Sequence, residues 1–106
     1  MSVFAAKSYW PGVTEDELAR AATRAVREAA RLSRAGTAVT YIGAILFADD
    51  ELVLCMFEGH SRTVVKQVSE RAGIPCERTM ESLWLAPPNP EGSPGCPNMT
   101  RPRGPR

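Results

Sequence analysis

The residues best suited to chemistry lie close together in the middle of the chain. Cys55, Glu58 and His60 offer a thiol, a carboxylate and an imidazole within one short stretch. Imidazole and thiolate groups bind nickel, zinc and copper, and carboxylates act as general bases or as metal ligands. His60 is the only histidine, so a metal site built on it needs oxygen or sulfur donors, or a second copy of the chain.

Two interpretations stay open for His60 and for Cys55. His60 is either a metal ligand or a solvent-exposed loop histidine, and it directly precedes Ser61, a suitable N-cap for a helix. Cys55 lies between apolar residues in the middle of an expected strand. It is either a small hydrophobic residue of the core or a thiol that faces a ligand pocket.

Glu58 and Glu81 lie in two different expected strands, and Tyr41 lies in a third. If the three side chains face a common cavity, the carboxylates are candidate general bases or ligands and the phenol is a hydrogen-bond donor. The alternative is structural: Glu81 pairs with a nearby basic residue, and Glu58 accepts amide hydrogen bonds at a helix start. The candidate ligand pocket is therefore Tyr41, Cys55, Glu58 and Glu81, with His60 as the candidate metal ligand.

The elements that must position these residues can be predicted from periodicity and from stop signals. Thr14 and Glu17 form a capping box before a helix, and Gly36 and Gly73 end the two expected helices. Strands are indicated by β-branched and aromatic runs bounded by turn residues. The expected strands are residues 3–10, 38–47, 52–58 and 76–85, and the expected helices are residues 14–35 and 62–72. The inward helix positions are expected to be Leu18, Ala22, Ala25, Ala29 and Leu32, then Val64, Val65, Val68 and Ala72.

This order predicts an α+β fold of the ferredoxin-like βαββαβ kind over residues 1–86. Its two right-handed crossovers give a four-stranded antiparallel sheet with both helices on one face. The strand at residues 52–57 is apolar on both faces, although no further element remains to cover the open face. We therefore expect a homodimer formed through the open sheet face.

Composition limits the classes of function. The formal net charge is +1, which gives no general support for nucleic-acid binding, and we expect neither a nucleic-acid partner nor a membrane. Five arginines lie on one face of the first helix, which we interpret as a solvated face. Three cysteines without a CxxC spacing favour a cytoplasmic protein without a disulfide framework. Most of the nine prolines fall in residues 87–106, which predicts a disordered proline-rich C-terminal tail.

Two blocks of the sequence resemble a bacterial family of small ferredoxin-like proteins. The blocks are Cys-Met-Phe-Glu-Gly-His-Ser at residues 55–61 and Arg-Ala-Gly-Ile-Pro-Cys-Glu-Arg at residues 71–78, followed by Glu81. Most members of this family are known only as a domain of unknown function, and one branch binds nickel. Members often carry Ala-Pro where this chain has Gly59 and His60. The sequence also has no multi-histidine pattern to match, so the resemblance implies nickel without assigning its ligands.

Three functional hypotheses follow. The first is a small dimeric binding protein that holds nickel or another small ligand with His60 and carboxylates. The second is a dimeric α+β barrel enzyme, such as a cyclase, an isomerase or a cofactor-free oxygenase, with Glu58, Glu81 and Tyr41 as its acid–base groups. The third is an adaptor that engages a partner through the proline-rich tail.

Overall fold

The computed structural model of the protein describes residues 1–88. The predicted tail therefore lies outside the described residues, apart from Pro87 and Pro88, which are exposed. The elements follow one another as β1 (Ser2–Tyr9), α1 (Glu15–Arg34), β2 (Val39–Phe47), a 3-10 turn (Ala48–Asp50), β3 (Leu52–Gly59), α2 (Arg62–Arg71) and β4 (Arg78–Ser82). The predicted βαββαβ order is confirmed.

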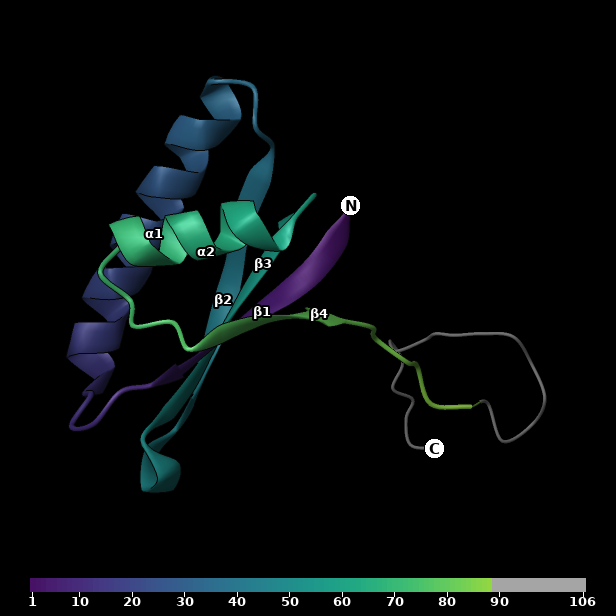
Figure 1. Cartoon of the computed structure of the whole chain (residues 1–106). Helices are drawn as coiled ribbons and strands as arrows, with labels where there is room; N and C mark the ends of the chain where they lie inside the picture. Colours follow the sequence, from purple (N-terminus) through teal and green to yellow (C-terminus); the bar gives the residue numbers. More distant parts are fainter. Residues whose placement is uncertain (89–106) are drawn as a thin grey trace, which may run out of the picture.

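The four strands form one antiparallel sheet in the order β2-β3-β1-β4. Both helices cover the same face of this sheet (Figure 1), as the right-handed crossovers require. The ferredoxin-like fold class is confirmed. Within residues 1–88, no helix is long and apolar enough to cross a membrane.

Helix α1 begins and ends at the predicted signals. The Thr14 hydroxyl accepts a hydrogen bond from the backbone N–H of Glu17 at 3.1 Å, which satisfies one of the donors that a helix start leaves free. Gly36 has a φ of +104°, which a residue with a Cβ adopts only at a cost. The buried positions are Leu18, Ala21, Ala25 and Ala29, whereas Ala22 is only half-buried.

Helix α2 is capped in the same way. The Ser61 hydroxyl accepts from the N–H of Val64 at 3.3 Å, and Gly73 takes a φ of +76° just after the helix. Val65 and Val68 are fully buried as predicted. Ser69 is fully buried too, a position that the apolar periodicity does not identify.

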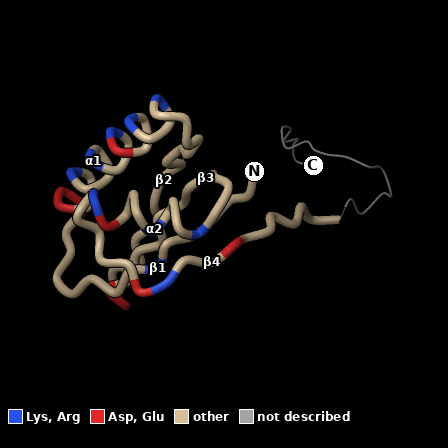
Figure 2. Tube along the Cα trace, turned by 45° about the horizontal axis from the view of Figure 1, so that its top comes forward, with Lys and Arg blue, Asp and Glu red and all other residues tan. Residues whose placement is uncertain are grey.

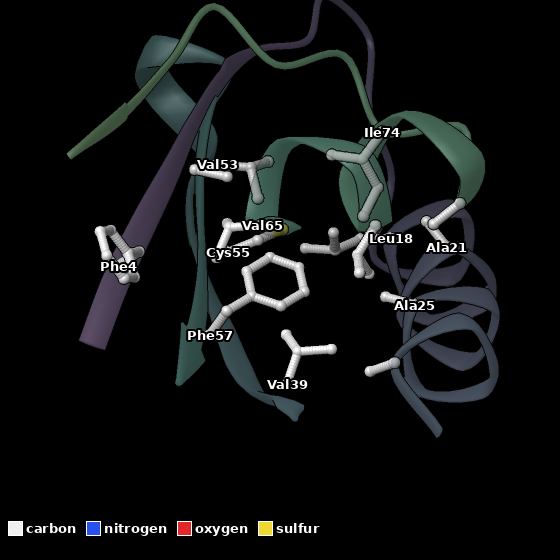
Figure 3. Packing of buried hydrophobic residues seen from close by; sticks show 14 residues of the cluster. Phe4, Leu18, Ala21, Ala25, Val39, Val53, Cys55, Phe57, Val65 and Ile74 are labelled. Atoms are coloured by element: carbon white, nitrogen blue, oxygen red, sulfur yellow. The ribbon is translucent and has the colours of Figure 1, made fainter. Parts of the chain in front are cut away.

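The core lies between the helices and one face of the sheet. Val53, Cys55 and Phe57 of β3 point toward the helices, and Phe57 lies at the centre of the cluster with Val65 and Leu18 opposite the sheet (Figure 3). All three β3 side chains are fully buried. The alternation of strand side chains therefore places Leu52, Leu54, Met56 and Glu58 on the other face.

Strand β4 is shorter than predicted. It ends at Ser82, which pairs with Val3, because β1 extends only one residue further and offers almost no strand to pair with. The predicted residues 83–85 are instead exposed chain beyond the sheet. At its other end, the N–H of Glu77 donates to the carbonyl oxygen of Lys7 at 2.8 Å before the strand begins.

Candidate functional site

The open face of the sheet is apolar along most of its length. Residues that pair across antiparallel strands share a face, so the register groups Leu54 with Lys7 and Ile45, and Met56 with Ala5. The exposure rises toward the β2 edge, where Ile42, Ile45 and Phe47 are 55%, 49% and 42% exposed. This face of the described domain has no covering element.

One end of the open face is polar. Thr40 pairs with Glu58, Glu58 pairs with Val3, and Val3 pairs with Ser82, so the Glu58 carboxylate lies in a row with two hydroxyl residues. His60 follows β3 directly at this end and is exposed, as is Glu58. An imidazole and a carboxylate are therefore available to solvent at the same end of the sheet.

Tyr41 and Cys55 lie on the opposite face, toward the helices. The Tyr41 ring packs edge-on against Phe57, with the ring centres 5.2 Å apart. Burial raises the pKa of Tyr41 well above its ordinary value, and the neighbouring Cys55 raises it further. Burial also raises the pKa of the Cys55 thiol to about 11, although Tyr41 opposes part of that shift.

Glu81 is held by a contact across the sheet. It pairs with Phe4, so it lies on the helix side of the edge strand, and the Ser2 hydroxyl donates a hydrogen bond to its Oε2 at 2.7 Å. The structural alternative for Glu81 was an ion pair with a basic residue. The structure instead shows a hydrogen bond from the Ser2 hydroxyl.

The candidate pocket is thus divided between the two faces. Tyr41 and Cys55 come together under the helices, Glu81 lies at the β4 edge, and Glu58 faces the other way. The hypothesis that Tyr41 shares a cavity with Glu58 is wrong, because the register places their side chains on opposite sides of the sheet. The sequence predicts each strand but not the register in which the strands pair. A shift of one residue in that register moves every side chain of a strand to the other face.

A shallow groove between α1 and β2 has no counterpart in the sequence analysis. It has a volume of about 490 Å³ and is lined by small residues of both elements, including Ala19, Ala22, Gly43 and Ala44, together with Tyr41. The β-bulge between Tyr41 and Gly43 locally widens this edge. The sequence feature that could have indicated this groove is the presence of small residues in both α1 and β2, because small side chains leave space between the two elements.

The family resemblance raises the question of whether these residues fit a metal. In the described part of the chain, no group of three or more histidine, cysteine, aspartate and glutamate side chains is close enough to hold one. Glu58 and His60 supply two donors at one end of the open face, and the Cys55 thiol is buried and protonated at neutral pH. A metal site on this face therefore needs donors from a second copy.

A family comparison settles where the chain belongs. The sequence profile described as "Nickel responsive protein SCO4226-like" matches residues 6–81, which include every candidate site residue. The chain belongs to the SCO4226-like family. Among the curated proteins, none matches the sequence significantly.

A solved structure supports the same fold for the SCO4226-like domain. The crystal structure of SCO4226 from Streptomyces coelicolor A3(2) superposes with a TM-score of 0.61 at 23% sequence identity. The alignment covers 80% of this chain and 100% of the Streptomyces chain. The residues that follow β4 lie beyond the family match.

Proposed function

We propose that the protein binds nickel as a twofold dimer in which two open sheet faces pack together. The observation that carries the proposal is the division of the open face into an apolar surface and a polar end with Glu58 and His60. The apolar surface supports association, because a sheet face of this kind needs a cover. The polar end supplies the ligands, and the family name supports nickel as the metal.

The symmetry of the dimer decides whether the donors meet. A twofold axis parallel to the strands keeps the same strand ends together, whereas an axis across the strands separates them. Strand β3 is central in the sheet, so a parallel axis brings the two His60 loops to the same end and near the axis. Two imidazoles and two carboxylates then surround one position.

This donor set suits nickel. Imidazole nitrogen is a good ligand for Ni²⁺, and carboxylate oxygens or water complete its coordination. His60 supplies the nitrogen that discriminates nickel from harder ions such as Mg²⁺, and Glu58 supplies charge that offsets that of the ion. The metal itself contributes the positive charge and the preference for nitrogen, while the protein contributes the placement of the donors.

The geometry does not favour the acid–base enzyme as a second candidate. Tyr41 and Glu58 lie on opposite faces of the sheet, and the Tyr41 side chain lies on the helix side, packed against Phe57, rather than on the open face. No other observation in residues 1–88 selects a reaction.

Calorimetric titration with Ni²⁺ tests the proposal. His60→Ala should abolish binding, and Glu58→Gln should weaken it by at least about tenfold, because each removes a donor. Glu81→Gln is the matched control, since this carboxylate lies on the other face, and it should bind as the wild type does.

Two results would contradict the proposal. Equal nickel affinities for the wild type and His60→Ala would remove the imidazole from the site. A wild-type protein that releases no heat with Ni²⁺ and carries none after dialysis would remove nickel binding itself.

A further inference from the structure

Two methionines lie in one row on the open face of the sheet. Ala5 of β1 pairs with Met56 of β3 on one side and with Met80 of β4 on the other. Residues that pair across antiparallel strands share a face, and the alternation along β3 places Met56 on the face without helices. Two thioether side chains therefore flank one alanine, and neither belongs to the proposed nickel site.

The burial of Ala5 indicates that side chains of the open face close over it. Ala5 is only 6% exposed, although it does not belong to the core cluster under the helices and no element of the described domain covers its face. The residues directly opposite it, Met56 and Met80, are both half-buried. Long, flexible methionine side chains fill gaps of this kind, so they account for the cover over Ala5.

The strand spacing lets the two sulfur atoms reach one point above Ala5. Neighbouring strands lie about 4.8 Å apart. The Cα atoms of Met56 and Met80, which are separated by β1, are therefore on the order of 10 Å apart. Each methionine side chain has three rotatable bonds and extends far enough to cover most of its half of that distance. The two sulfur atoms can thus contact a single ion without a movement of the backbone.

Thioether sulfur selects a soft metal ion. Methionine sulfur suits Cu⁺, whereas nickel takes imidazole nitrogen readily. The thiols of residues 1–88 lie elsewhere, because Cys55 belongs to the core cluster and Cys76 packs against that cluster. The methionine pair is therefore a soft donor set on the open face that is separate from the thiols of the described domain.

We propose that Met56 and Met80 form a binding site for Cu⁺ on the open face, with one thioether sulfur from each strand. Both donors belong to one chain, so the site does not rest on the proposed dimer or on nickel. In that dimer, an axis parallel to the strands would set the same rows of the two copies opposite each other. Four thioethers would then surround the ion.

Methyl NMR of the full chain tests the site. Protein labelled with ¹³C at the methionine ε-methyl groups gives separate signals for Met1, Met56, Met80 and Met99. Titration with Ag⁺, a soft ion of the same charge that resists oxidation, should move the Met56 and Met80 signals together. Met1, which is 63% exposed, and Met99 are internal controls whose signals should stay in place at the same Ag⁺ concentration. Cu⁺ is also diamagnetic, and under a reducing agent it should give the same pattern.

Leucine variants separate metal binding from packing. Met56→Leu and Met80→Leu keep an apolar side chain of similar volume, so each variant should unfold at nearly the same temperature as the wild type. Each should weaken Ag⁺ binding at the remaining methionine by at least about tenfold, because one of the two donors is lost. Met99→Leu is the matched control and should leave the Met56 and Met80 shifts unchanged.

Two results would overturn the inference. Met56 and Met80 signals that stay in place at an excess of Ag⁺ would show that the pair is not a donor set. Signals that move no earlier than those of Met1 and Met99 would show binding to any thioether rather than to a site. Neither result bears on nickel, because both leucine variants keep His60 and should bind Ni²⁺ as the wild type does.

Discussion

Cys55 and Glu58 lie three residues apart in one strand, yet they face different surroundings. The Cys55 thiol is fully buried among Val53, Phe57 and the helices, where the low dielectric disfavours a thiolate. Glu58 is exposed on the open face. Strand β3 is apolar on both faces, so its sequence alone is compatible with a core position or a pocket position for Cys55. The register of β3 with β1 and β2 places Cys55 in the core.

The raised pKa of Cys55 predicts a pH dependence of stability. The folded pKa is about 11 and the unfolded one is about 8.5, so the folded state binds more protons between these values. The contribution is fully present below pH ~8.5 and is lost as the pH rises toward 11. Cys55→Ala should therefore show a smaller loss of unfolding free energy between pH 8 and pH 10.5, measured by urea titration.

The control for this measurement is Cys76→Ala. Cys76 is only partly buried, and its pKa is also raised by burial, so its removal should flatten the alkaline decline less than Cys55→Ala does. Equal slopes in the wild type and in Cys55→Ala would contradict the account of a buried, protonated thiol.

The two helices are joined by side chains that the helix periodicity does not reveal. Arg24 of α1 donates from Nε to the carbonyl oxygen of Ala72 at 2.7 Å, where α2 ends and its carbonyl groups lack helical partners. Glu28 of α1 pairs with Arg31 and, at 3.4 Å, with Arg71 of α2. The arginine face predicted as solvated is thus partly an interhelical contact, although basic residues do run along α1 (Figure 2).

The prediction for the helix pair is that Arg24→Ala destabilises the protein. Loss of a charged, partly buried hydrogen bond to the carbonyl oxygen of Ala72 should lower the free energy of unfolding by about 1–2 kcal/mol. The melting temperature should then fall by roughly 4–8 °C for each kcal/mol. Arg27→Ala, on the exposed side of the same helix, should change stability by less than about 0.5 kcal/mol. Equal effects of the two substitutions in thermal denaturation would contradict a stabilising role for the hydrogen bond from Arg24 to the end of α2.

Periodicity predicted both helices and most of their inward faces, but not Ala21 or Ser69. These two positions depend on how α1 and α2 cross the sheet and each other, which a single helix pattern does not contain. Likewise, the shortened β4 follows from the length of its neighbour β1 rather than from its own composition. Local signals therefore predicted the elements, and contacts between elements decided their exact bounds and the side chains they bury.

For the molecule as a whole, the open face links the fold to the proposed function. The βαββαβ order leaves one sheet face without helices (Figure 1), and the apolar sequence of β3 makes that face the surface through which we propose that the protein associates. The same topology places Glu58 and His60 at one end of a central strand, where the proposed dimer would double the donors. The homodimer through this face stays a prediction, and the sequence analysis placed residues 83–85 in the last strand, whereas they are exposed chain beyond the sheet.

Native mass spectrometry of the full chain with Ni²⁺ tests the account most directly, since one spectrum reports both the assembly and the metal. The protein should be seen at twice 11.5 kDa, with one nickel ion per dimer, and the metal should be lost in His60→Ala while the dimer remains. A nickel-loaded monomer of 11.5 kDa, or a dimer that takes up no nickel, would contradict a metal site shared between two open sheet faces.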